Sequence, residues 1–401
     1  MSRLLSLAVR NLGRRRLRTF ATVSAIALGV MALLLLRGMT SAIQHVNRSL
    51  LIDGVLGALQ VHPAGWSEAA EMSPLSLDFE DTADLRRAIA AVPGVRAVAP
   101  RITFGAGLQA GDAEARYFVA TAIEPVAEAQ VTPLRVEWVS RWPASADEAA
   151  VVPSAELADG LPVEDLALLA SDRDELLNGE PVRIGGTAKS GLPGNRRYAF
   201  VPLGLAQRLL RMEGRVTEYG VALQPGADAA EVKRGVAAAL GPGYEVHTWS
   251  ELMPFLAEIE RGQDGFGLTM GFILLTVVLL GVGSTMQMNV MDRVREVGTL
   301  LALGARRSTV RALFVLEGLV QAGVGVGLGS LFGFSALAAL RAADLRLAAP
   351  GSELPQRIVP AIELHWAVVY VAATVLGAVL ASYFPARSAA RLEPAGALRE
   401  S

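Results

Sequence analysis

Residues Gly265–Met291 read GFGLTMGFILLTVVLLGVGSTMQMNVM and contain no charged side chain. Three further runs are apolar and uncharged in the same way, at Thr19–Leu36, Gly318–Leu340 and Trp366–Ala386. A helix of ~20 predominantly apolar residues crosses a hydrocarbon core of ~30 Å, and lipid offers no hydrogen-bond partners for an irregular backbone. The sequence therefore predicts a polytopic α-helical membrane protein with four transmembrane helices.

The charges between these runs are distributed unevenly, although the net charge of the chain is only -2. From Gly38 to Asp264 there are 31 acidic and 19 basic residues. The segments Met1–Arg18, Asp292–Ala312 and Arg387–Ser401 together hold 14 Arg and 4 acidic residues. Because cytoplasmic loops are enriched in Lys and Arg, we expect cytoplasmic N- and C-termini and a large domain on the outer side.

The predicted organisation follows from these runs and charges. In chain order it has a cytoplasmic amphipathic segment (1–18), a first span (19–37), an outer domain with stalk helices (38–264), a second span (265–288), a cytoplasmic loop (289–312), a third span (313–340), an outer loop (341–365), a fourth span (366–385) and a cytoplasmic tail (386–401). The first apolar run is longer than the core of a signal peptide, which favours an uncleaved anchor.

The outer domain shows a faint internal duplication. Each copy reads strand, helix, strand: Ala58–His62, Thr82–Ala91 and Val95–Pro100, then Tyr219–Gln224, Ala229–Leu240 and Tyr244–Trp249. Two such units predict an α+β domain with paired halves. A further hairpin is expected from Ile102–Gln109 and Ala115–Ala122, and the segment 132–215 is interpreted as an insertion.

Helical spacing of apolar residues continues on both sides of the outer domain. It involves Met39, Ile43, Val46 and Leu50 after the first span, and Leu252, Leu256 and Ile259 before the second. Two interpretations fit this spacing. Spans one and two continue as a paired helical stalk, or two amphipathic helices pack separately on the domain.

Composition excludes several classes of function. The chain has no Cys, so it has neither disulfides nor Cys-ligated metal sites, and its four His lack ligand spacing in the sequence. The basic residues cluster at membrane edges rather than on a soluble face, which argues against nucleic-acid binding. With no catalytic motif, the sequence predicts a protein that is not an enzyme and binds no metal or cofactor.

Small residues recur at intervals of four in two spans. They are Gly325, Gly329 and Gly333 in the third span, and Ala25 and Gly29 in the first. Such spacing lets helix backbones approach closely in lipid. We expect a helix–helix seam, either within the bundle or across a dimer, although the chain is rich in glycine throughout.

Glu317 is a charged residue close to the start of the third span. A charge at the centre of a spanning helix costs ~2.5–3.5 kcal/mol, so Glu317 is expected to face the bundle or the interface. An interhelical or interfacial structural contact is the prediction, and a proton relay is the alternative.

The segment Asp292–Ala312 is the most distinctive short stretch. It combines a charged opening, an apolar patch and a glycine break: Arg293, Arg295, Glu296, Gly298, Leu300, Leu301, Leu303, Gly304 and Ala305. An exposed apolar helix face in an inner loop indicates a cytoplasmic protein partner. A surface helix lying on lipid headgroups is the alternative.

The order of one span, a large outer domain and three spans resembles the MacB/FtsX-like permeases, the type VII ABC transporter family. The similar residues are Arg293–Ala305, Glu317-Gly318 with the glycines that follow, and the ending Pro385–Arg399. The branch that looks most similar is the LolC/LolE-type lipoprotein-release permease subunits. The outer domain then corresponds to a MacB-type periplasmic core with an added insertion.

This resemblance implies a bacterial inner-membrane permease that works as a homo- or heterodimer. A cytoplasmic ABC ATPase, carrying the ATP and Mg, would dock on a coupling helix formed by Glu296–Ala305. A periplasmic lipoprotein chaperone is a further candidate partner beside the membrane lipids, with a hook near Gly191–Gly194. Two functions remain open: extraction of lipoproteins or other amphipathic molecules, and FtsX-like mechanical control of a periplasmic cell-wall hydrolase.

Overall fold

The computed structural model describes residues 16–69, 75–145, 147–189, 197–347 and 355–391. The chain divides into two compact units. The helical unit holds Met1–Gln44, Ile259–Leu345 and Ile358–Ser401, and the head holds His45–Glu258 and Arg346–Arg357. The hook expected near Gly191–Gly194, most of the amphipathic segment at 1–18 and the end of the terminal motif lie outside the described residues.

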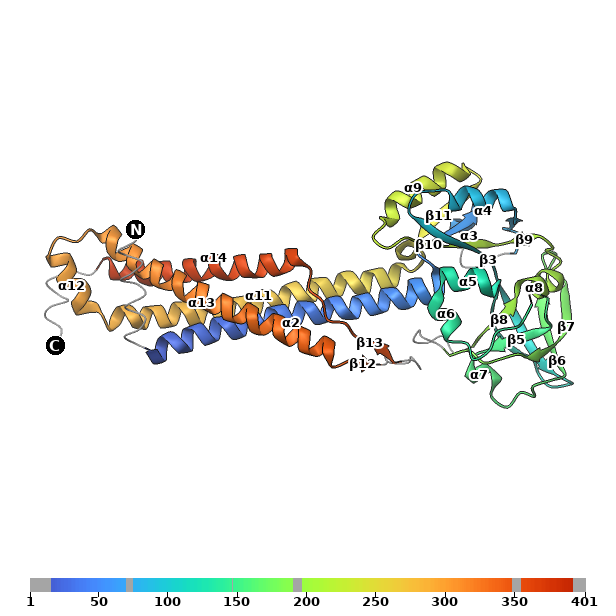
Figure 1. Ribbon diagram of the computed structural model, residues 1–401, viewed down its shortest axis with the longest axis horizontal. Helices are drawn as coiled ribbons and strands as arrows, with labels where there is room; N and C mark the ends of the chain where they lie inside the picture. Colours follow the sequence, from blue (N-terminus) through green and yellow to red (C-terminus); the bar gives the residue numbers. More distant parts are fainter. Residues whose placement is uncertain (1–15, 70–74, 146, 190–196, 348–354, 392–401) are drawn as a thin grey trace. The chain divides into compact units, whose positions relative to one another are not determined.

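Four long helices build the helical unit (Figure 1). They are α2 (Arg16–Leu51), α11 (Pro254–Met291), α13 (Arg307–Ala342) and α14 (Leu364–Ala389), and the short α12 (Val294–Ala302) connects α11 to α13. All four are long and apolar enough to cross a membrane, as the sequence predicts. Helix α13 begins within the predicted loop 289–312, because hydropathy marks the edge of the apolar zone and not the first helical turn.

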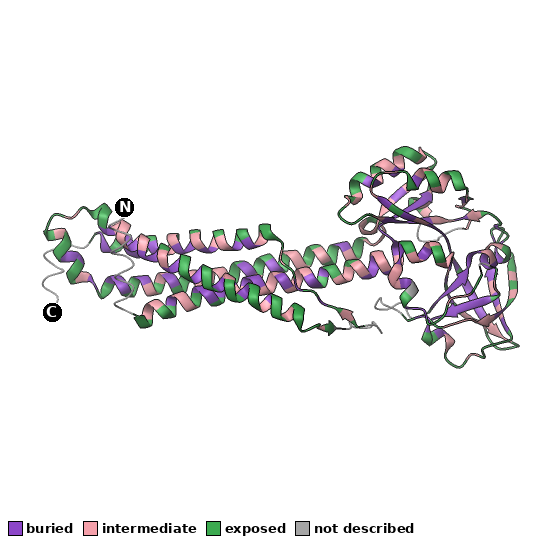
Figure 2. Cartoon of the chain, viewed as in Figure 1, coloured by how far each residue is buried: buried purple, intermediate pink, exposed green. Residues whose placement is uncertain are grey.

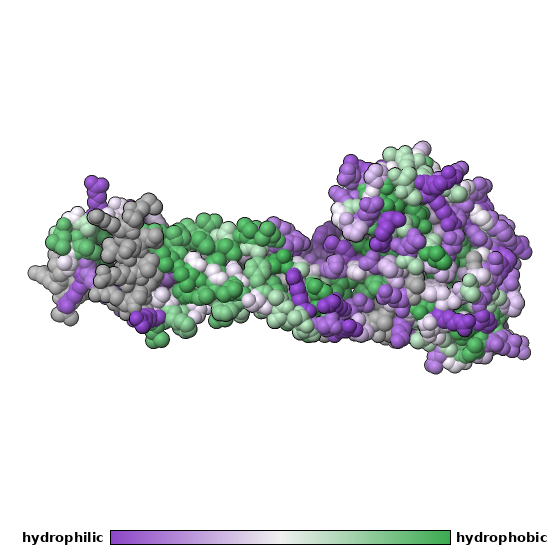
Figure 3. All heavy atoms as spheres, viewed as in Figure 1, coloured by the Kyte–Doolittle hydropathy of each residue, from purple (hydrophilic) through white to green (hydrophobic). Residues whose placement is uncertain are grey.

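The bundle carries many exposed residues (Figure 2), and the face seen in Figure 3 is largely apolar. Phe272 and Leu280 of α11 are 70% and 68% exposed, and Phe384 of α14 is 74% exposed. Side chains of this kind are expected to contact lipid, since a soluble protein rarely leaves so large an apolar area in water. The interior is filled by a compact cluster: Ile26, Val30, Leu34, Val282, Met286, Ala322, Val326, Ala367 and Ala378.

Helices α2 and α11 extend beyond the predicted spans and are paired there. Arg37 Nη1 donates to Asp264 Oδ1 at 2.6 Å, and the Gln44 amide donates to the same atom at 3.1 Å and to the Glu260 carbonyl at 3.3 Å. These contacts favour the paired stalk over two separate helices. Helix α2 is followed by one π-helical turn, η1 (Ile52–Leu56).

One half of the head is a split β-α-β fold. Strands β1 (Leu59–Pro63), β3 (Val95–Ala110), β10 (Glu218–Leu223) and β11 (Tyr244–Thr248) form an antiparallel sheet in the order β11-β1-β10-β3, with helices α4 (Ala83–Ala90) and α9 (Ala229–Leu240) between them in the chain. The duplicated strand–helix–strand pattern is thus confirmed, and its two copies interleave in one sheet.

The other half is a closed ring of strands. The distal part of β3 pairs with β4 (Arg116–Ile123), and the ring continues through β8 (Tyr198–Pro202), β5 (Ala150–Pro153), β7 (Leu177–Ile184) and β6 (Leu166–Ser171) back to β3. Two expectations are corrected. The segment 132–215 is no separate insertion, because its strands complete this ring. The break predicted between the strands Val95–Pro100 and Ile102–Gln109 is absent, because β3 is continuous.

Short elements join these strands. They are α3 (Trp66–Ala69), β2 (Phe79–Glu80), α5 (Pro125–Val131), α6 (Pro133–Glu137), α7 (Ala155–Ala158), α8 (Leu203–Leu209), β9 (Arg215–Val216) and α10 (Trp249–Leu252). Between α13 and α14, β12 (Arg346–Leu347) and β13 (Gln356–Arg357) pair with each other.

Candidate functional site

Helix α12 has one buried and one exposed face. Val297 is 3% exposed and packs with Val290, Val310 and Phe314, while Leu301 covers the edge of this cluster. Leu300 and Leu303 are 44% and 80% exposed. The apolar patch predicted from the sequence is therefore divided: one leucine holds α12 to the bundle, and two are open to a partner or to lipid.

The end of α12 is closed by a Schellman motif. The Ala305 amide donates to the Leu300 carbonyl at 3.0 Å, and the Gly304 amide donates to the Leu301 carbonyl at 3.1 Å. Gly304 has a φ of +88°, which a residue with a side chain rarely adopts. Gly304 therefore fixes the turn that presents Leu303, and Arg295 and Glu296 remain exposed at the other end of the helix.

Arg293 occupies a different place from the one the sequence suggested. It precedes the first turn of α12, is only 8% exposed, and its Nη1 donates to Glu317 Oε1 at 2.7 Å. Glu317 is 2% exposed on α13, so the interhelical contact expected for it is present. Arg293 is thus a residue that positions α12 on the bundle and is not accessible to a docking partner. Arg18 of α2 pairs with the neighbouring Asp292.

Three glycines of α13 form a close seam with α2. A Cβ atom at Gly325 would lie 2.7 Å from Ile26 Cβ, one at Gly329 2.5 Å from the Ala27 carbonyl oxygen, and one at Gly333 2.8 Å from Leu34 Cδ1. Gly29 lies against Val278 of α11 instead. Ala25 is exposed within the chain, because the row facing α13 is the one that contains Ile26. Within the chain, Ala25 therefore takes no part in the seam.

Substitutions in α13 should show whether the seam depends on close contacts at particular glycines or only on the abundance of glycine. Gly329→Val is expected to destabilise the helical unit by about 1–3 kcal/mol, since the new side chain meets backbone that cannot move aside. Gly327→Val is the matched control, because a Cβ there would meet nothing within 4 Å. Detergent-induced unfolding of the two variants measures the difference. Equal losses for both would contradict a specific seam.

The head contains a charged cluster that the sequence did not reveal. Arg101 in β3, Glu128 in α5 and Arg135 in α6 are 0%, 0% and 4% exposed. Arg101 Nε and Nη2 donate to the Glu128 carboxylate at 3.0 and 2.7 Å, and Arg135 Nη1 lies 3.0 Å from Glu128 Oε1. The signal in the sequence was weak, because Arg101 lies 27 residues from its partner Glu128 in the chain.

Ionisation within this cluster follows from burial and charge. Burial acts to raise the pKa of Glu128, but the attraction of Arg101 and then of Arg135 outweighs it and holds this pKa below its usual range. Burial lowers the pKa of Arg135 to about 10 even though Glu128 opposes the change. All three groups therefore stay charged near neutral pH.

The head contains a buried histidine with a lowered pKa. His62 in β1 is 1% exposed and stacks on Trp66 with ring centroids 3.8 Å apart. Burial, with a further contribution from His247, lowers the pKa of His62 to about 3. The imidazoles of His62 and His247 are 5.7 Å apart, so these two histidines are separate only in the sequence.

Acid should therefore destabilise β1 through His62. Between about pH 7 and about pH 5 the unfolded chain gains a proton that the folded head excludes, which lowers the free energy of unfolding by about 2 kcal/mol. His62→Gln should remove this part of the loss. Hydrogen exchange of the β1 amides in the full chain, corrected for intrinsic rates, measures it. An equal acid effect in both proteins would contradict this origin.

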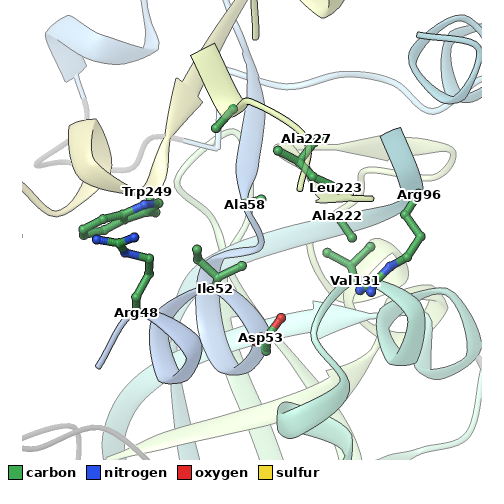
Figure 4. A pocket seen from close by; sticks show the side chains of 11 residues that line it. Arg48, Ile52, Asp53, Ala58, Arg96, Val131, Ala222, Leu223, Ala227 and Trp249 are labelled. Carbon is green, nitrogen blue, oxygen red and sulfur yellow. The ribbon is translucent and has the colours of Figure 1, made fainter. Parts of the chain in front are cut away.

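A cavity of about 320 Å³ borders the head end of α2 (Figure 4). Ile52 and Asp53 of η1 form one wall, and Ala222 and Leu223 of β10 form another. The guanidinium carbon of Arg48, in the last turns of α2, lies 5.6 Å from the centre of the Trp249 ring. This pair stands at the side of the cavity.

Two family models match the chain. The FtsX-like permease C-terminal model matches residues 268–394, and the MacB-like periplasmic core domain model matches residues 19–239, more than half of the chain. These regions contain the segment Asp292–Ala312 and most of the head, respectively.

Curated relatives of the chain include proteins named macrolide export ATP-binding/permease protein MacB. The protein from Hyphomonas neptunium is 32% identical over 146 residues, 36% of this chain and 21% of that protein. The protein from Escherichia coli K12 is 29% identical over 232 residues, 56% of this chain and 34% of that protein. The match thus spans about a third or less of the length of these relatives.

The solved structures that align with the chain include two of transporter domains, both with low TM-scores. The periplasmic region of MacB from Actinobacillus actinomycetemcomitans is 8% identical with a TM-score of 0.36, covering 53% of this chain and 98% of that structure. The extracellular domain of the ABC-type transporter YknZ is 13% identical with a TM-score of 0.34, covering 47% of this chain and 99% of that structure. On the two family models, the chain belongs to the MacB/FtsX-like family of ABC transporter permeases.

Proposed function

We propose that this chain is a permease subunit that converts ATP hydrolysis by a cytoplasmic ABC ATPase into movement of a periplasmic head. The observation that supports it most is the exposed apolar side of α12, Leu300 and Leu303, on a helix that a buried ion pair holds to the bundle. Such a helix transmits displacement only if it is fixed at its base, and Arg293–Glu317 fixes it.

In this proposal the ATP and Mg are bound by the ATPase, and the permease works in the bacterial inner membrane with a second permease subunit. The cargo is a lipoprotein or another amphipathic molecule taken from the outer leaflet. The apolar outer surface of the bundle supports contact with lipid-anchored molecules. A periplasmic lipoprotein chaperone would receive the cargo.

Cysteine accessibility tests the topology on which this proposal depends. The chain contains no Cys, so single variants report one position each. We expect a membrane-impermeant maleimide to label Val126→Cys, 80% exposed in the head, in spheroplasts. It should label Leu303→Cys only after lysis. Labelling of both positions from the same side would overturn the proposal.

A second function is favoured by the paired outer ends of α2 and α11. Arg37, Gln44 and Asp264 link these helices by hydrogen bonds, as a device that transmits motion without carrying cargo would require. The protein would then control a periplasmic cell-wall hydrolase. Lipoprotein retained in the inner membrane by an ATPase-inactive complex would support extraction. Normal lipoprotein release together with loss of hydrolase activity would support control.

A further inference from the structure

The end of the α2–η1 helix is closed in an unusual way. The last carbonyl groups of a helix have no partners within it and normally bond to water or to a following turn. Here the carbonyls of Gly54, Val55 and Leu56 accept hydrogen bonds from two buried arginines. Arg101 Nη1 donates to the Leu56 carbonyl at 2.8 Å, Arg135 Nε donates to that of Gly54 at 3.2 Å, and Arg135 Nη2 donates to that of Val55.

Both arginines are held in turn by Glu128. Their guanidinium groups come from β3 and α6 and the carboxylate comes from α5, so one ionic cluster connects the helix end to three elements of the head. The negative end of the helix dipole adds to the attraction of the arginines. We call this arrangement, Arg101, Glu128 and Arg135 with the three carbonyls, the carbonyl clamp.

The packing at Gly54 adds a steric constraint. A Cβ atom there would lie 2.2 Å from the Trp138 ring, which is 8% exposed. Only glycine therefore allows the backbone to come close enough for Arg135 to reach its carbonyl. On the side of Ile52 and Asp53, η1 borders the 320 Å³ cavity instead (Figure 4).

Three buried charges are a poor means of stabilising a fold. Replacing a buried ion cluster by apolar residues is often neutral or even stabilising, because desolvation offsets the attraction between the charges. The clamp instead provides a defined geometry, because guanidinium groups that make several hydrogen bonds fix the rotation and the position of the helix end. A plain hydrophobic contact would allow the end to slide.

We propose that the carbonyl clamp is the joint through which α2 moves the head. This inference rests on the proposed function, since it names the place where displacement of a spanning helix becomes displacement of the head sheet. Arg101, Glu128 and Arg135 are positioning residues in this scheme. All three are buried in the head.

Two variants loosen the clamp in different ways. The triple variant Arg101→Met, Glu128→Leu, Arg135→Met removes the three charges of the clamp together. Gly54→Ala keeps every charge and displaces the helix end from Trp138. The matched control is Arg86→Met, which removes an arginine that binds Asp81 and Glu124 but does not contact η1.

The first measurement concerns the chain alone. Spin labels at His45→Cys on α2 and Glu231→Cys on α9 report how tightly the helix end is held, and both positions are exposed in the head. We expect a narrow distance distribution in the wild type and the control, and one roughly twofold wider in both clamp variants. If the triple variant does not fold, the width measured for Gly54→Ala alone tests the inference. An unchanged width would overturn the clamp as a joint.

The second measurement uses the full complex with its ATPase. Labels at Gly262→Cys on α11 and Glu231→Cys should shift with ATP in the wild type and the control. In the clamp variants this shift should be lost while ATP hydrolysis continues. A normal shift in these variants would overturn the inference. Absence of any shift in the wild type would overturn the proposed function instead, whatever the width measured without ATP.

Discussion

Replacing Glu317 by Ala is expected to lower the free energy of unfolding of the helical unit by about 3–5 kcal/mol, because Arg293 is then left buried without its carboxylate. The double variant Arg293→Glu, Glu317→Arg, which swaps the two charges, should recover part of this loss. Detergent-induced unfolding of the purified chain measures all three proteins.

Glu296, one turn after Arg293, serves as the control for the Arg293–Glu317 pair. Glu296 Oε2 is 3.9 Å from Arg293 Nε, but its side chain is 65% exposed. Glu296→Ala should therefore cost less than about 1 kcal/mol. A loss for Glu317→Ala as small as that for Glu296→Ala would show that the ion pair does not hold α12 to α13.

Changing Leu303 to Asp should weaken binding of the ATPase by about 2–4 kcal/mol, or roughly 30- to 1,000-fold, if this leucine is the centre of the interface. The physical reason is that an 80%-exposed leucine would fill an apolar pocket of the partner, whereas a carboxylate there would be desolvated without a partner. Titration of the solubilised permease with purified ATPase gives the affinity.

Val126→Asp is the matched control for this substitution. Val126 is also 80% exposed, but it lies on α5 in the head. Its affinity for the ATPase should be that of the wild type. Equal affinities for Leu303→Asp and the wild type would exclude α12 as the docking helix.

The four spans were predictable because lipid imposes a local rule on sequence. Any run such as Gly265–Met291 must satisfy its backbone internally, so length and hydropathy are sufficient. The split β-α-β half of the head was visible for a similar reason, since alternation in Tyr219–Gln224 and helical spacing in Ala229–Leu240 are short-range patterns. The hairpin of β3 and β4 was expected, but the ring was missed because it closes through long-range pairings of β6 with β3 and of β8 with β4.

The candidate site was predictable only in part. The exposed leucines of α12 follow from its amphipathic pattern, but the roles of Arg293 and Glu317 depend on a contact between residues 24 positions apart. The carbonyl clamp depends on contacts 45 and 81 positions apart in sequence. Its members look like ordinary surface charges in the sequence, and only folding removes them from water.

The docking role of α12 can be tested in living cells by photo-crosslinking from a single position. A benzophenone amino acid at Leu303 should crosslink to a protein with a nucleotide-binding domain, and the same group at Val126 should not. This is the expected result if the exposed side of α12 receives an ATPase. A Leu303 adduct found only with lipid or with periplasmic proteins would contradict the account.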